Sequence, residues 1–268
     1  NKEFEVIVAH SGEDPETPQH INKHAQNYTF PITYIKCKTK GAASQRNEGV
    51  GHACFDWIFF LDDDMELQNN YLEEIITYIK KNGRKIGGVC GIIKNQTFTP
   101  ISKGKKTLLK LLGVQDTHNL QGKIVGPCIN FWPAQDGPEE EGIMAMPTGA
   151  SIYNKEIFIK AGGFSPFFQD YSLAEDVYIS LMVSKIKPLI LIRTAIAYHN
   201  DNSKLGRKLM HEYATMEIKN KSFIIRSLNP SNAKSMIFKL YIWLVANRLF
   251  MLIKHPQHLK QHLHFFHG

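Results

Sequence analysis

The chain has 268 residues, of which 43% are hydrophobic and 21% charged, so it can bury a core as one large domain or one domain with an appendage. Its formal net charge of +7 favours anionic partners such as nucleotides, phosphates or acidic membranes, without choosing among them. The four cysteines are widely spaced, which argues against a disulfide scaffold or a zinc knuckle. A reducing, cytoplasmic location is therefore expected.

Short apolar stretches alternate with polar or small-residue stretches through the first hundred residues. Strands are expected at 4–9, 32–35, 57–61 and 89–93, and helices at 41–54 and 70–81. Asn70 is predicted to cap the helix that follows it, with Glu73 closing a capping box and Gly83 ending the helix. This alternation predicts an α/β protein with a Rossmann-like, mostly parallel sheet and helices on both faces.

Residues 94–145 break this pattern with a long Gly- and Lys-containing stretch, which is more typical of a functional excursion than of a passive linker. Regular structure is expected again at 147–153 and 155–161. A further helix should begin near Glu175, followed by a strand at 189–192 and a second apolar run to Tyr198.

The main domain is predicted to span residues 1–205 and a C-terminal helical extension residues 206–268. Residues 236–253 are nearly all apolar, at the lower limit for a membrane span, and their interior charges argue against crossing. Two alternatives stay open: an interfacial helix and a helix packed on the main domain. The aromatic side chains expected to insert into a membrane are Phe238, Trp243 and Phe250.

Three adjacent carboxylates, Asp62, Asp63 and Asp64, follow the apolar run 57–61. Like charges this close raise one another's pKa unless a cation neutralises them. Mg²⁺ and Mn²⁺ take oxygen ligands, often one or two carboxylates plus substrate phosphates. Ligands of open α/β sheets bind beyond the carboxyl ends of the strands. A solvated turn is the alternative, but a metal–phosphate site is the sharper interpretation.

A second acidic pair, Glu175 and Asp176, precedes an apolar helical stretch. Acidic residues in a first helical turn can simply favour the helix dipole, or one of them can be a general base across a cleft from the metal. His199, at the end of a strand, is ambiguous, and a lone histidine at such a position is more often structural than a metal ligand.

Four blocks, in order, resemble glycosyltransferase family 2, inverting enzymes with a nucleotide-sugar-binding GT-A fold. They are FEVIVAHSGED, GAASQRNEGVGHACFDWIFFLDDD, PTGASIYNKEIFIKAGGF, and AEDVYISLMV followed by AYHN. The likeness runs from about Phe4 to His199. The chain begins where the family's second strand would begin, so a longer natural protein with one more strand is expected.

The resemblance implies a division of labour among these residues. A divalent metal, Mn²⁺ or Mg²⁺, would be held by Asp64, Asp62 and His199, and the base would be Asp176, with Glu175 beside it. The implied donor-binding residues are His10, Ser11, Arg46, Asn47, Asp62, Asp63, Gly149 and Ala150. His10 and Ser11 stand where the family often has two aspartates that help select the nucleobase.

The implied partners are a nucleotide-sugar donor, most simply a UDP-sugar, and a sugar or lipid-linked acceptor. A role in cell-envelope polysaccharide synthesis, on the inner face of a membrane, would follow from the resemblance. One rival is a nucleotidyltransferase of related fold, which would normally show a Gly-rich phosphate loop. Another is a basic membrane- or nucleic-acid-binding module, but the basic residues are dispersed, so nucleic acid is not expected as a partner.

Overall fold

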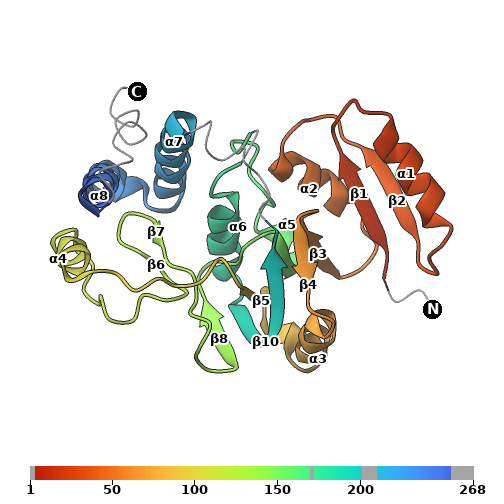
Figure 1. The fold of residues 1–268 in the computed structure, drawn as a ribbon, viewed down its shortest axis with the longest axis horizontal. Coiled ribbons are helices and arrows are strands. Elements are labelled where there is room, and N and C mark those ends of the chain that lie inside the picture. The colour runs from red at the N-terminus through yellow and green to blue at the C-terminus, as the bar shows by residue number, and fades with distance from the viewer. Residues whose placement is uncertain (1–3, 170–171, 201–209, 255–268) are drawn as a thin grey trace.

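The computed structural model describes residues 4–169, 172–200 and 210–254. Figure 1 shows an N-terminal strand pair with its helices on one side, a sheet in the centre and a helical layer on the other side. The elements alternate between strand and helix along most of the chain, so the predicted α/β class is confirmed.

The N-terminal part is a two-stranded parallel sheet of β1 (Val6–His10) and β2 (Ile32–Lys36), joined by helix α1 (Glu16–Ala25). Helix α2 (Ala42–His52) packs on β1 and ends just before β3. Small residues allow this approach, since a Cβ added at Gly49 would lie only 3.8 Å from the Cβ of Ala9. Both strands fall where the β-branched runs predict them.

The central sheet has the strand order β3-β9-β5-β10-β4, and β8 also pairs with β10. These strands are β3 (Trp57–Leu61), β9 (Ala150–Asn154), β5 (Gly88–Ile93), β10 (Leu189–His199), β4 (Met65–Leu67) and β8 (Glu140–Ile143). The strands β3, β5 and β10 run in one direction, as expected. Strand β9, inserted between β3 and β5, runs against them, as do the short strands β4 and β8.

Helices cover both faces of this sheet. Helix α3 (Tyr71–Asn82), continued by a 3₁₀ turn at Gly83–Lys85, covers one face and packs into a hydrophobic cluster there. Helices α5 (Lys155–Lys160) and α6 (Glu175–Ser184) belong to a second, larger hydrophobic cluster. Asn70 and Gly83 stand at the two ends of α3 as predicted, but the predicted capping bond of the Asn70 side chain is wrong. The Asn70 side chain makes no capping bond and instead donates to the carboxylate of Glu74 at 3.4 Å.

Strand β10 is continuous where the sequence suggested two apolar runs, and it contains a bulge. Its register against β5 shifts between Ile192 and Ile196, which leaves three residues of β10 without partners on β5. Gly91 permits this, because a Cβ there would lie 2.1 Å from the carbonyl oxygen of Ala195. Beyond the bulge, β10 pairs with β4 and places His199 opposite Met65.

The excursion at 94–145 is folded. It contains α4 (Lys103–Leu111), the hairpin β6 (Ile124–Val125) and β7 (Ile129–Asn130), and then β8. The buried guanidinium of Arg193 in the β10 bulge donates to the carbonyls of Ala134 and Pro138 and pairs with Glu141. These contacts fix the end of the excursion to the sheet.

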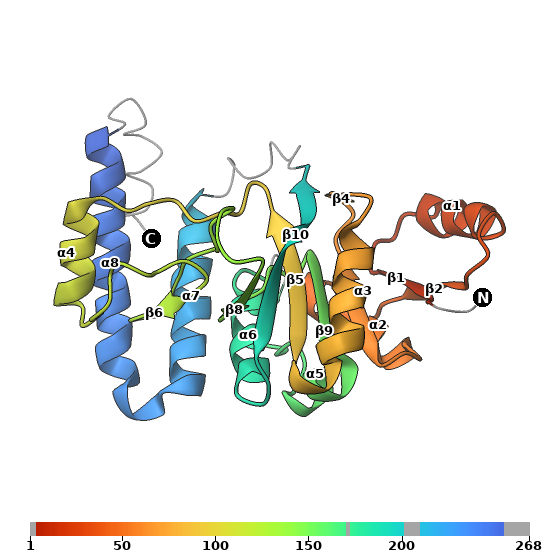
Figure 2. The same ribbon diagram turned by 90° about the horizontal axis from the view of Figure 1, so that it is seen from below.

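The C-terminal layer consists of α7 (Met210–Leu228), a 3₁₀ turn at Pro230–Asn232, and α8 (Ala233–Lys254). Figure 2 shows α7, α8 and α4 running side by side. Ile224 of α7 and Leu240 and Trp243 of α8 belong to the same buried cluster as Phe158 of α5, so these helices share the core of the sheet domain. The predicted boundary at 205 falls outside the described residues.

Helix α8 therefore packs on the domain, which is the second of the two alternatives. The expected membrane insertion of Trp243 is wrong because its side chain is buried, and Phe250 is turned towards Gly104 of α4. Phe238, by contrast, is exposed. Across the described ranges, no helix combines the length and apolar character needed to cross a bilayer.

Candidate active site

The first acidic motif begins at the carboxyl end of β3. The backbone N–H of Asp62 donates to the carbonyl of Gly149 at 3.0 Å, which joins this turn to the start of β9. One carboxylate oxygen of Asp62 accepts from Arg46 Nη2 at 2.7 Å. A Cβ added at Gly149 would lie 2.8 Å from the other oxygen, so a residue without a side chain is required beside this carboxylate.

Asp64 meets His199 at the end of β10, where Asp64 Oδ2 and His199 Nε2 are 3.0 Å apart. Both side chains reach solvent, with exposed fractions of 46% and 25%. The backbone N–H of Asn200 donates to the carbonyl of Asp64 at 2.8 Å, which fixes the two segments together. The pairing of β4 with β10 thus brings together two residues that are 135 positions apart.

The carboxylate oxygen of this pair suits Mn²⁺ or Mg²⁺, whereas the imidazole nitrogen is a ligand that transition metals accept more readily than Mg²⁺ does. Asp62 faces Arg46 instead of the pair. Within residues 4–169, 172–200 and 210–254, no group of three His, Cys, Asp or Glu side chains is placed to hold a metal ion. A bound metal would therefore depend on substrate oxygens for its remaining ligands.

Arg46 of α2 connects the two acidic motifs. Its Nη1 donates to Glu175 Oε1 at 2.8 Å while its Nη2 donates to Asp62 Oδ1 at 2.7 Å, and its guanidinium lies 5.7 Å from the ring centre of Phe164. The next residue, Asn47, donates to the carbonyl of Phe164 at 2.8 Å and accepts from its N–H at 3.0 Å. Both side chains therefore tie α2 to the second half of the domain.

Glu175 and Asp176 form the first turn of α6. The Glu175 side chain is 12% exposed, and the Asp176 carboxylate accepts from the N–H of Val177 at 2.7 Å. Burial raises the pKa of both carboxyl groups, the Asp176 charge raises the pKa of Glu175 further, and Arg46 acts in the opposite direction. The net direction is upward, because burial is the largest of these influences on both pKa values.

The other predicted donor-binding residues lie around this centre. His10 ends β1 and Ser11 follows it, and the His10 ring is 3.2 Å from the hydroxyl of Tyr34. Asp63 is exposed, and Ala150 is buried on β9 opposite Leu61. The structure thus brings Arg46, Asp62 and Glu175 together, and Asp64 together with His199. A donor-binding role of His10, Ser11, Arg46, Asn47, Asp62, Asp63, Gly149 or Ala150 stays a prediction.

Sequence reasoning missed the link from Arg46 to Glu175 and every contribution from α7. Arg46 and Glu175 are 129 residues apart, and no local pattern connects them. The adjacent Arg-Asn at 46–47 was noticed only through the family resemblance. Helix α7 packs into the core of the sheet domain, and no local pattern in its sequence identified that partner.

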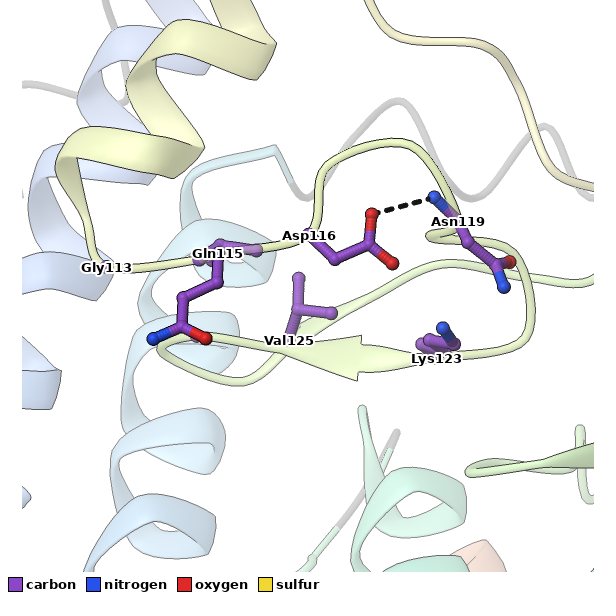
Figure 3. A pocket seen from close by; sticks show the side chains of 8 residues that line it. Gly113, Gln115, Asp116, Asn119, Lys123 and Val125 are labelled. Carbon is purple, nitrogen blue, oxygen red and sulfur yellow. Dashed lines mark hydrogen bonds between the residues drawn. The ribbon is translucent and has the colours of Figure 1, made fainter.

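A surface hollow of about 350 Å³ lies elsewhere, in the excursion between α4 and the β6–β7 hairpin (Figure 3). Its polar side chains include Asp116, Asn119 and Lys123. Asp116 is already satisfied by the backbone N–H groups of His118 and Asn119, at 2.8 and 3.2 Å. None of the acidic-motif residues lines this hollow, so it is not part of the candidate active site.

The model of glycosyl transferase family 2 matches residues 1–169, and the chain belongs to this family. An uncharacterized glycosyltransferase of Haemophilus influenzae is 40% identical over 58 residues, which cover 21% of this chain and 20% of that protein. The chain thus matches only about a fifth of this relative's length.

Two solved structures show the fold. The mannosyltransferase PcManGT from Pyrobaculum calidifontis, in complex with GDP-Man and Mn²⁺, is 12% identical with a TM-score of 0.56, over 98% of this chain and 75% of its own. GalNAc-T7 with UDP, GalNAc and Mn²⁺ is 16% identical with a TM-score of 0.50, over 80% of this chain and 41% of its own. The chain therefore has the predicted GT-A fold.

Proposed function

We propose that this protein transfers a sugar from a nucleotide sugar to an acceptor hydroxyl, with metal assistance and inversion at the anomeric carbon. The observation that carries the proposal is the pairing of Asp64 with His199 at the sheet edge, on the same family-2 scaffold that buries Asp176.

On the donor side, Asp64 and His199 would hold a divalent metal against the diphosphate of the donor. Such a metal neutralises the charge that develops on the departing nucleoside diphosphate. The two solved structures above contain Mn²⁺ with UDP or GDP-Man, which supports a nucleotide-sugar donor of this kind. A UDP-sugar is the first donor to test.

On the acceptor side, Asp176 takes the proton of the attacking hydroxyl. A base works best when its pKa lies near the operating pH, and burial moves the Asp176 pKa in that direction. Glu175 is bonded to Arg46 and is therefore less free to accept a proton. A single displacement on the anomeric carbon needs no protein nucleophile and inverts its configuration.

The test is a panel of nucleotide sugars incubated with the full chain, with Mn²⁺ and with EDTA, scoring nucleoside diphosphate release. Release that requires Mn²⁺ and is accelerated by one sugar or lipid-linked acceptor is expected. The stereochemistry of the product, read by NMR, tests inversion. Pyrophosphate release from a nucleoside triphosphate and a sugar phosphate would instead identify the nucleotidyltransferase rival.

Peripheral membrane binding is proposed for the outer face of α8, with a lipid-linked acceptor as its rationale. Apolar side chains on this face are exposed, with fractions of 67% for Phe238 and 78% for Ile253, and Tyr241 and Leu249 lie between them. At about 100° per residue these four positions fall within about 120° of the helix surface, so they form one stripe. The net charge of +7 would add attraction to anionic lipid.

Deleting α8 would uncover the core around Leu240 and Trp243, so point substitutions are the better test. Phe238→Ser with Ile253→Ser should reduce sedimentation with anionic vesicles and leave the melting temperature unchanged. A surface substitution outside the stripe, Thr107→Ser on α4, is the control. Equal vesicle binding by the double variant would refute an α8-mediated contact.

A further inference from the structure

The turn that carries the acidic pair has a strained backbone. Ser172 and Ala174 adopt left-handed conformations, with φ of 57° and 67°, and neither is glycine. Helix α6 starts directly after Ala174 without a side-chain cap. Non-glycine residues in this region persist only where the surroundings hold them. The segment 172–176, called the acid turn below, therefore needs contacts from outside itself.

One such contact comes from Arg46 and another from α7. The side-chain amide of Asn220 donates to the carbonyl of Leu173 at 2.7 Å, across 47 residues of sequence. Asn220 is 4% exposed, so this bond forms in a dry environment where an amide without a partner is costly. The bonded carbonyl lies between the two strained residues.

The same face of α7 holds the segment that leads into the acid turn. The ring of Phe223 stacks on Phe167 with centroids 3.9 Å apart and an interplanar angle of 6°. Lys219 Nζ lies 5.4 Å from the centre of the Phe167 ring. Positions 219, 220 and 223 are neighbours on a helix surface. One face of α7 therefore contacts both Phe167 and Leu173.

We propose that Asn220 is a positioning residue for the acid turn: its amide holds the Leu173 carbonyl so that Glu175 stays within reach of Arg46 and Asp176 stays at the start of α6. The kinetic consequence rests on the proposed function; the structural one does not. Helix α7 is then part of the catalytic unit, although it lies in the predicted C-terminal extension.

The variant to test is Asn220→Leu, which keeps the approximate shape and neutrality of the side chain and removes the donor. Without that bond the acid turn should relax from its left-handed conformations, and Asp176 should shift. Misplacement of a reacting group by about 1 Å can cost roughly a hundredfold in rate. A fall in kcat of about 10- to 100-fold is therefore expected, with donor Kd in Mn²⁺ unchanged.

Hydrogen exchange gives a readout that does not depend on turnover. Amides of residues 172–178 should exchange faster in Asn220→Leu, while the amides of α3 and β5 keep their protection. Ser222→Ala is the matched control, because Ser222 is also buried but lies two positions along α7, about 200° around the helix. Asn220→Ala serves the same purpose if the leucine variant does not fold.

A rescue experiment separates positioning from general loosening. Ala174→Gly removes the side-chain penalty for the left-handed conformation, so it should restore part of the lost kcat in Asn220→Leu. Unchanged exchange and unchanged kcat in Asn220→Leu would overturn the proposal, as would equal effects of Ser222→Ala. If the unaltered chain turns over no nucleotide sugar, the proposed function fails, and the exchange comparison still decides the role of Asn220.

Discussion

The two acidic motifs of this protein differ in their surroundings. The Asp64–His199 pair lies at the sheet edge in contact with solvent, whereas Glu175 and Asp176 lie in a buried, strained turn at the start of a helix. An open pair can exchange water for a metal and phosphate without rearranging the fold. A buried pair has a raised pKa and can exchange a proton near neutral pH. The same residue type thus suits two tasks because the environments differ.

Arg46 lies between the motifs and bonds to a carboxylate from each, Asp62 and Glu175. A change at Asp62 or Glu175 should therefore alter the other acidic motif through Arg46. A change at Asp64 or His199 should have a smaller effect on the other motif, because neither residue is paired with this arginine. Four expected outcomes test this contrast.

The largest effect is expected from Asp176→Asn, which removes the proton acceptor and keeps the shape of the side chain. Transfer should fall by roughly two to four orders of magnitude, the range usual for loss of a general base. Donor affinity in Mn²⁺, measured by calorimetry, should stay within about twofold. Glu175→Gln should be milder; if it is the inactive variant and Asp176→Asn remains active, the base is Glu175.

Asp64→Ala should weaken metal-dependent donor binding by more than the roughly 10- to 100-fold that loss of a residue behind a metal ligand costs, because Asp64 is itself a proposed ligand. The melting temperature should hardly change, since the side chain is half exposed and outside the core. Calorimetric titration with Mn²⁺ and nucleotide sugar measures the loss. Normal binding by this variant would show that Asp64 is not a metal ligand. Unfolding of the variant would show that Asp64 has a structural role.

Gly149→Ala tests the ion pair between Arg46 and Asp62 by crowding the Asp62 carboxylate. The added methyl would approach the Asp62 carboxylate to 2.8 Å and push it away from Arg46. Overpacking of this kind costs about 1–3 kcal/mol, which should lower the melting temperature by several degrees. Ala161→Gly, at the end of α5, is a control for a one-methyl change. An unchanged melting temperature would mean that Asp62 has room to move.

The smallest effect concerns pH and the metal-free protein. A carboxyl group whose pKa is raised on folding stabilises the fold fully below its unfolded pKa and loses this contribution as pH rises through the folded value. The free energy of unfolding should therefore fall by about 1 kcal/mol or more from about pH 4 towards neutrality. Denaturant titrations should show a flatter profile for Glu175→Gln. A steeper profile for Glu175→Gln would mean that the effect of Arg46 on the Glu175 carboxyl group exceeds that of burial, so that the pKa of Glu175 is lowered on folding.

The elements with clear edges were predictable from sequence. Residues 57–61 were expected as a strand and form β3, and the helix expected near Glu175 begins there. An apolar run between polar residues defines a buried strand with little help from its surroundings. The Asp62–Asp64 cluster was likewise visible, because its charge and its place after β3 depend on local sequence alone.

Long-range partners were not predictable in the same way. Asn70 had the sequence of a cap, but its amide bonds to Glu74 instead. Trp243 lies in a helix with apolar residues on all sides, so nothing in its spacing says which face is covered. Arg46 reaches Glu175 only because α2 and α6 meet in space. The burial of Trp243 and the Arg46 link depend on packing between distant segments, whereas the Asn70 bond joins residues four positions apart.

The bulge in β10 limits where residues can be inserted into or deleted from this strand without moving His199. Successive side chains of a strand point to opposite faces, so the number of residues between the bulge and the strand end decides the side on which His199 emerges. The residues at 193–195 without partners on β5 set that parity, and Gly91 makes room for them. Loss of a single residue there would turn His199 away from Asp64 without altering either residue. The register of β10, as much as the identity of the two side chains, therefore determines whether Asp64 and His199 can form a pair.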